Sequence, residues 1–112
     1  MKAKEWQYKN IKPKIIIERL LIDSNGKIPN DIKFSCTNGN AEIVYLDSNK
    51  EIKHLRNNYP RNFELLVINW PEEYQRNSYI KMPDNFFKAR ELAERLADPF
   101  PFVRADFYLI DN

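Results

Sequence analysis

The chain has 112 residues, 18 Lys and Arg against 16 Asp and Glu, and a formal net charge of +2, so it holds one domain at most and its charge does not indicate a nucleic-acid partner. Apolar residues make up 43% and charged residues 30%, which is ordinary for a folded protein and argues against a disordered chain. No apolar run approaches the roughly 18 residues of a membrane span and no secretory signal is present, so we expect a cytoplasmic protein.

The first predicted strand covers residues 15–22 (IIIERLLI), an apolar and β-branched run that only Glu18 and Arg19 interrupt. This pattern indicates a strand buried on at least one face. A turn is expected next, at residues 23–27, because Gly26 can adopt the positive φ that turns often need.

A β-hairpin is the clearest local pattern. Residues 31–37 (DIKFSCT) alternate between apolar and polar side chains, with Cys36 on the apolar face. Asn38-Gly39 follows, and this pair is the strongest short signal for a tight hairpin turn. Residues 41–47 (AEIVYLD) then predict the return strand.

The segment after the hairpin is less regular. Residues 48–62 are polar and predict a loop, and residues 63–70 (FELLVINW) predict an apolar strand that Pro71 ends. A further loop is expected at residues 72–83.

One helix is predicted at residues 84–97, with Asp84 as its N-cap. Its apolar residues recur at helical spacing: Phe86, Phe87, Ala89, Leu92, Ala93, Leu96 and Ala97. Asp98-Pro99 ends the helix, and residues 100–110 (FPFVRADFYLI) predict the last strand. The fold class is therefore α+β, a largely antiparallel sheet with one main packed helix.

We expect residues 1–112 to form a single partial domain. The last predicted strand stops two residues before the end, and Asp111-Asn112 is a natural start for a turn into one more strand that the sequence does not contain. Such a domain would have an exposed sheet edge, which could pair with another copy of the chain.

Several common sites can be excluded. Cys36 is the only cysteine and His54 the only histidine, so neither an intramolecular disulfide nor a zinc site of the usual Cys and His ligands can form. Gly26 and Gly39 are the only glycines, too few for a Gly-rich phosphate loop.

Three features could carry chemistry. Glu18 is a carboxylate inside an apolar strand, which indicates a ligand contact, an ion pair or an outward-facing position. Arg104 and Asp106 lie two apart in the last strand and so share a face, where they would bind a metal–phosphate pair or form an ion pair with each other. His54 and Arg56 lie in a polar loop, the setting of many binding residues and of ordinary solvated ones.

Taken in order, these segments resemble the C-terminal part of the TupA-like ATP-grasp proteins of bacterial cell-surface polysaccharide gene clusters, which are often labelled glycosyltransferases. The resemblance covers nearly the whole chain, and its most specific blocks lie at residues 5–18 (EWQYKNIKPKIIIE) and 101–108 (PFVRADFY). Residues 31–34 (DIKF), Asn38-Gly39, and His54 with Arg56-Asn57 lie between them.

The resemblance implies an enzyme that uses ATP and Mg²⁺ to activate a carboxylate. It makes Glu18 the residue that accepts from the adenine amino group, with the backbone of Leu20 or Leu21 completing adenine recognition. It makes Asp31 the ribose-binding acid and Asp106 a Mg²⁺ ligand. Three further residues would take the catalytic and phosphate-binding positions: Arg104, His54 and Arg56.

The chain also departs from the family pattern. Asn58-Tyr59-Pro60 stands where an aromatic residue and then Asp usually follow, and the N-terminal domain, the lid domain and the strand with a second Mg²⁺ ligand are absent. We therefore expect a nucleotide and a polysaccharide precursor as partners of a longer parent, and a chain that does not catalyse alone. The alternatives are a non-catalytic binding or assembly module and a component of a polysaccharide glycosyltransferase.

Overall fold

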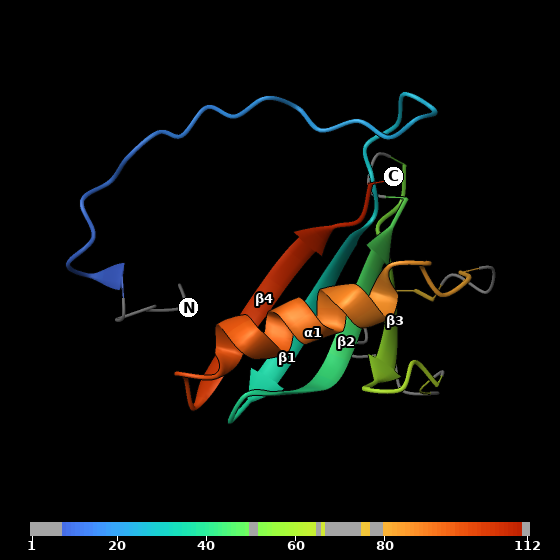
Figure 1. Ribbon diagram of the computed structural model, residues 1–112. Helices are drawn as coiled ribbons and strands as arrows, with labels where there is room; N and C mark the ends of the chain where they lie inside the picture. Colours follow the sequence, from blue (N-terminus) through green and yellow to red (C-terminus); the bar gives the residue numbers. More distant parts are fainter. Residues whose placement is uncertain (1–7, 50–51, 65, 67–74, 77–79, 111–112) are drawn as a thin grey trace.

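The computed structural model describes residues 8–49, 52–64, 66, 75–76 and 80–110. In this part of the chain, four antiparallel strands form one sheet in the order β3-β2-β1-β4, and one α-helix packs across a single face of it (Figure 1). The elements are β1 (Asp31–Thr37), β2 (Asn40–Ser48), β3 (Leu55–Pro60), α1 (Phe86–Ala97) and β4 (Phe102–Tyr108). The predicted α+β class is confirmed.

The hairpin between β1 and β2 is also confirmed. Asn38 and Gly39 have φ angles of 48° and 79°. Positive φ at both central residues is what a two-residue turn needs to match the twist of its strands, and Asn-Gly adopts it at low cost. Thr37 consequently pairs with Asn40.

A β-bulge follows after two residue pairs beyond this turn. Cys36 pairs with Ala41 but Ser35 pairs with Ile43, so Glu42 is an extra residue in β2. The apolar pattern requires the shift, because Ala41 and Val44 are both fully buried although they are three positions apart, an odd spacing that would put them on opposite faces of a regular strand. The bulge therefore changes which of the later β2 side chains face the helix.

The core lies between the sheet and α1. The helix turns a stripe of buried residues toward the sheet, Phe86, Ala89, Ala93 and Ala97, and the alanines allow close approach. Three other residues of the predicted apolar set stay exposed on the flanks of this stripe: Phe87, Leu92 and Leu96.

The predicted N-cap was wrong. Asp84 is almost fully exposed and lies 3.9 Å from Lys81, while the N-cap position belongs to Asn85, which makes no side-chain capping bond. Because the backbone N–H of Phe86 already donates to the carbonyl of Pro83, a tight turn leads into the helix in place of a side-chain cap.

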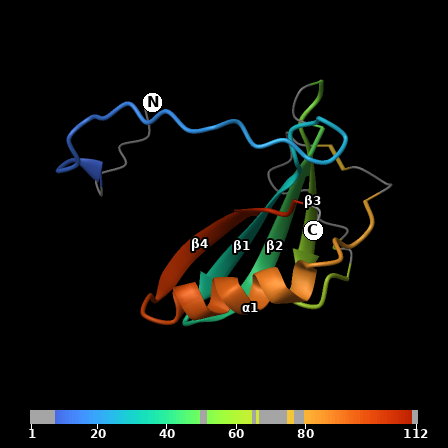
Figure 2. The ribbon, with the colours of Figure 1, turned by 45° about the horizontal axis from the view of Figure 1, so that its top comes forward.

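The strand predicted at residues 15–22 was wrong as well. Residues 12–23 have no regular secondary structure, and the segment forms an arc that runs away from the sheet (Figures 1 and 2). A strand needs a neighbour to take its backbone hydrogen bonds, and no described strand lies beside this segment. The turn at residues 23–27 is confirmed, with Gly26 at a φ of 74°.

A third correction concerns β3, which lies inside the region predicted as a loop at residues 48–62. The strand's sequence, LRNNYP, is mostly polar and gives no apolar alternation, although Tyr59 is buried in the core and Asn57 and Asn58 are buried too. The strand predicted at residues 63–70 is not found at 63, 64 or 66, and its other positions lie outside the described residues. In the predicted loop at residues 72–83, Gln75 forms a single parallel bridge with Leu55.

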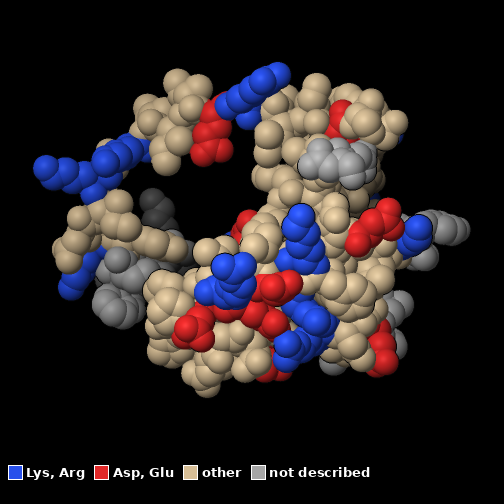
Figure 3. Space-filling model, viewed as in Figure 1, with Lys and Arg blue, Asp and Glu red and all other residues tan. Residues whose placement is uncertain are grey.

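Charges of both signs alternate over the helix side of the molecule (Figure 3). Figure 3 shows no broad patch of one sign on this side, which agrees with the small net charge. No helix in the described residues is long and apolar enough to cross a membrane.

Candidate functional site

The face of the sheet opposite α1 gathers most of the predicted site residues. Among the side chains that strand alternation and the register of the four strands place there are seven that we call the polar face: Asp31, Lys33, Tyr45, Asp47, Arg56, Arg104 and Asp106. Apart from Tyr45 these are charged groups, with acidic and basic side chains beside each other, whereas the helix side of the same strands is mostly apolar.

Asp47 is the centre of this arrangement. Its side chain is only 1% exposed, yet both of its oxygens are engaged. Oδ1 accepts from Nε of Arg56 at 2.6 Å, and Oδ2 accepts from a terminal guanidinium nitrogen of Arg56 at 2.8 Å and from Nζ of Lys33 at 2.9 Å. Nε2 of His54 lies 3.2 Å from Oδ1. Three strands thus meet at one buried carboxylate.

The electrostatics of Asp47 follow from these contacts. Burial alone would raise the pKa of its carboxyl group, but the hydrogen bonds from Arg56 and Lys33 and their positive charges outweigh this effect. The pKa of Asp47 is therefore held well below its usual range. The carboxylate is therefore ionised in the folded protein at neutral pH.

This depressed pKa predicts a loss of stability in acid. Because the unfolded state takes up a proton at Asp47 near pH 4 and the folded state does not, the contribution of Asp47 is complete above that pH and is lost as pH falls toward the folded pKa. We expect the free energy of unfolding, measured by urea denaturation, to fall between pH 5 and pH 2 more steeply in the wild type than in Asp47→Asn. Equal slopes would contradict this assignment.

Arg104 and Asp106 form the second group on the polar face. Nε of Arg104 donates to Oδ1 of Asp106 at 2.8 Å and a terminal nitrogen donates to Oδ2 at 3.0 Å. This bidentate pairing raises the pKa of Arg104. Both side chains are about half exposed, so the pair faces solvent where a ligand can reach it. In the register of β1 and β4, Asp106 lies opposite Lys33, which joins the two groups.

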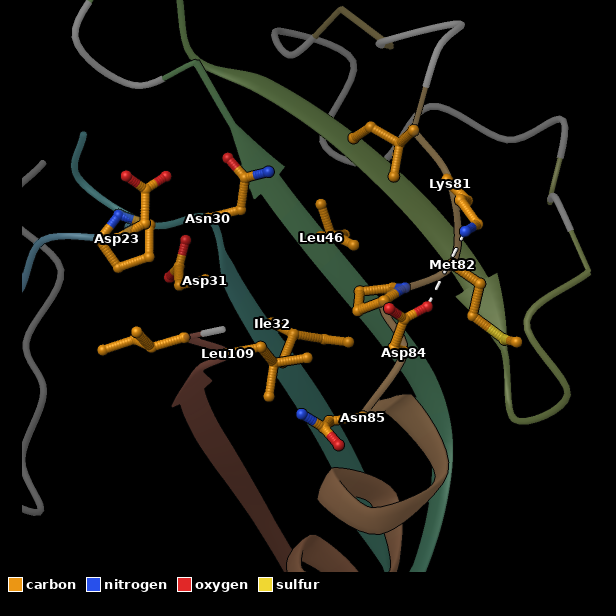
Figure 4. Close-up of a pocket in the computed structure, with 14 residues that line it drawn as sticks. Asp23, Asn30, Asp31, Ile32, Leu46, Lys81, Met82, Asp84, Asn85 and Leu109 are labelled. Carbon is orange, nitrogen blue, oxygen red and sulfur yellow. Dashed lines mark ion pairs between the residues drawn. The ribbon is translucent and has the colours of Figure 1, made fainter. Parts of the chain in front are cut away.

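Asp31 links the polar face to a cavity at the end of the sheet. Its carboxylate forms an ion pair with Lys33, and the residue also lines a cavity of about 640 Å³ (Figure 4). The cavity lies between the start of β1, the end of β4 and the start of α1. Its walls are both apolar and polar, for example Ile32, Leu109 and Asn85. This volume is within the range of pockets for small molecules.

The structure therefore brings together five of the eight predicted site residues, namely Asp31, His54, Arg56, Arg104 and Asp106. It does not bring Glu18, Leu20 or Leu21 to the polar face, because these residues lie in the exposed segment before the turn.

Lys33 and Asp47 were missed by the sequence prediction. Lys33 could have been found, since it lies two residues from Asp31 and so shares its face. Asp47 gave no such signal, because its partners come from β1 and β3 and β3 was not predicted.

The donor set fits a metal–nucleotide complex. Lys33, Arg56 and Arg104 are cations of the kind that bind phosphate oxygens, and Asp106 offers the carboxylate oxygens that Mg²⁺ prefers. No three His, Cys, Asp or Glu side chains converge as a preformed metal site within the described residues. Mg²⁺ keeps several waters and often shares its ligands with substrate phosphates, so one carboxylate agrees with such a site.

Comparison with known proteins gives one match. A family model described as TupA-like ATPgrasp matches residues 1–112, which is the whole chain. Searches of curated proteins and of solved structures found no match. The predicted resemblance, made from the blocks at residues 5–18 and 101–108, is confirmed. The chain belongs to the TupA-like ATPgrasp family.

Proposed function

We propose that the polar face is part of the Mg-ATP site of an ATP-grasp ligase-like protein that acts in bacterial cell-surface polysaccharide biosynthesis, in the cytoplasm. The observation that carries the proposal is the convergence of Lys33, Arg56 and Arg104 with Asp106 on one side of a single sheet. Family membership supports nucleotide and Mg²⁺ binding in general, and these four side chains are of the types that such binding needs.

The proposed ligand lies along the sheet. The nucleoside part is expected at the start of β1, where Asp31 lies beside the cavity and Glu18, Leu20 and Leu21 precede it in the chain. The phosphates would lie over the three cations, and Asp106 would hold Mg²⁺, which neutralises phosphate charge and polarises the group to be transferred. Arg104 would stabilise charge on the phosphate or on the reacting carboxylate, next to the metal. His54 would contact the phosphates or the acceptor.

Titration with Mg-ATP by calorimetry tests this proposal. Binding to the wild type is expected, with at least a tenfold rise of Kd in Asp106→Asn, because the variant removes the anionic oxygen offered to the metal. Its free energy of unfolding should change by less than about 1 kcal/mol, because the ion pair with Arg104 is exposed. Asp98→Asn, at the end of α1, is the matched control and should bind as the wild type does. Absence of binding to the wild type at millimolar Mg-ATP would refute the proposal.

A second candidate function is assembly with another copy of this chain. β4 is at one edge of the sheet, and its helix-facing residues are only half-buried: Val103, Ala105 and Phe107. The flank of α1 that carries Leu92 and Leu96 lies on the β4 side, because the other flank contacts the β2–β3 side through Glu94. An added strand would cover this apolar border.

The segment at residues 15–22 could supply that strand. Its isoleucines are among the most exposed in the chain, with Ile15 at 94% and Ile17 at 92%. Its eight residues match the length of β4, which has seven. An apolar, extended segment and an edge strand of the same length are complementary, since each can satisfy the backbone hydrogen bonds of the other.

Light scattering coupled to size exclusion tests the assembly. We expect a dimer or larger oligomer, and a dissociation constant at least tenfold weaker in Ile17→Lys, because a buried isoleucine contributes about 1.5–3 kcal/mol. Ile52→Lys is the control, since Ile52 is equally exposed but lies between β2 and β3. A monodisperse wild-type monomer would rule out the assembly.

A further inference from the structure

Asp47 is a buried carboxylate to which the proposed nucleotide site assigns no contact with the ligand. With 1% of its side chain exposed, it cannot itself reach a bound molecule. Yet its two oxygens accept three hydrogen bonds from cations that belong to the strands on either side of it, Lys33 on β1 and Arg56 on β3. Its contacts are therefore with the side chains that would bind the phosphates.

These contacts fix two long side chains. Lys33 and Arg56 are only 12% and 16% exposed, which is low for residues of their length. Unrestrained, such side chains have many rotamers, and ordering them on ligand binding would weaken affinity. Asp47 orders them in advance. The ring of Tyr45 supports the same arrangement, because the Arg56 guanidinium carbon lies 5.4 Å from its centre.

Lys33 retains capacity for a ligand. An ammonium group has three donors, and the contacts among the described residues engage two of those on Lys33, with Asp31 and Asp47. The strands that carry Lys33 and Arg56 flank β2, so their backbones lie about 10 Å apart. Two cations held on either side of a central strand match a chain of linked phosphates better than a single phosphate group.

We infer that Asp47 is a positioning residue that holds Lys33 and Arg56 for the polyphosphate chain of a nucleoside triphosphate. The inference rests on the proposed function. It predicts that Asp47 affects nucleotide affinity only through these two cations. It also predicts that Asp47 strengthens the binding of ATP but not that of AMP.

A double-mutant cycle measures this dependence. Mg-ATP and AMP are titrated by calorimetry into the wild type, Asp47→Asn, the pair Lys33→Met with Arg56→Met, and the combination of all three substitutions. Asp47→Asn should raise the Kd for Mg-ATP at least tenfold in the wild type, but less than twofold when both cations are already replaced. The Kd for AMP should change less than twofold. Equal effects on Mg-ATP in the two backgrounds would overturn the inference, because a general structural defect acts in both.

A second measurement needs no variant and remains decisive if Asp47→Asn does not fold. The Nε–H resonance of Arg56 and the ammonium resonance of Lys33 are followed by NMR in the wild type as Mg-ATP or inorganic tripolyphosphate is added. Both resonances should shift with a saturable dependence on either ligand. If Mg-ATP binds and neither resonance shifts, the inference fails and Lys33 and Arg56 leave the proposed site, while Mg-ATP binding with Asp106 as the metal ligand still stands. If Mg-ATP does not bind at all, both fail.

Discussion

Replacing Asp47 with alanine is expected to lower the free energy of unfolding by about 3–5 kcal/mol, which is the usual cost of removing one partner from a buried ion pair. The substitution leaves Lys33 and Arg56 mostly buried without the carboxylate that holds them. The loss is a large share of the roughly 5–15 kcal/mol by which a domain is stable. Urea denaturation at pH 7, followed by circular dichroism, measures it.

Asp106→Ala is the matched control for this first substitution. It also removes an aspartate from a bidentate ion pair on the polar face, but the pair is exposed, so we expect a loss of less than about 1 kcal/mol. The difference between the stability losses of Asp47→Ala and Asp106→Ala therefore measures the effect of burying the ion pair. Similar losses in the two variants would show that Asp47 does not stabilise the sheet as the structure indicates.

Phe86→Ala is expected to have an effect of the same size, about 3–5 kcal/mol, because it creates a large cavity in the core. Phe86 is fully buried at the start of α1. Its ring centre lies 5.8 Å from that of Phe34 on β1 and 4.7 Å from that of Phe63. The side chain therefore joins the first turn of the helix to the sheet and to the segment after β3.

Phe87→Ala is the control for this core substitution. Phe87 follows Phe86 directly, but its side chain is on the flank of the helix and the residue is 51% exposed. We expect it to cost less than half as much, measured by the same denaturation. An equal loss would mean that the helix packs on the sheet through a wider face than the buried stripe.

Local patterns predicted the hairpin and the helix because their determinants are close in the sequence. Asn38-Gly39 specifies its turn by the φ angles it can adopt, and Phe86, Ala89 and Ala93 mark one face of a helix by spacing alone. β3 could not be predicted in this way. Its Asn57 and Asn58 are polar yet buried, and only pairing with β2 makes this strand favourable.

At residues 15–22 the sequence predicted a strand that the structure does not form. The composition of this segment favours a strand, but composition does not supply a neighbour, and the structure leaves its apolar side chains exposed. The adenine-binding roles that the family resemblance implies for Glu18, Leu20 and Leu21 remain proposals. The same Mg-ATP titration, applied to variants of these residues, would test them.

The sequence by itself determined the fold class, the hairpin, the helix and family membership, since each depends on local spacing or on blocks of adjacent residues. Only the tertiary structure decided the centre of the polar face. The bulge at Glu42 sets the register that places Asp47 opposite Asp31, and β3 brings Arg56 to it from the other side. A one-residue change of register would turn Asp47 toward the helix, because successive side chains of a strand point to opposite faces.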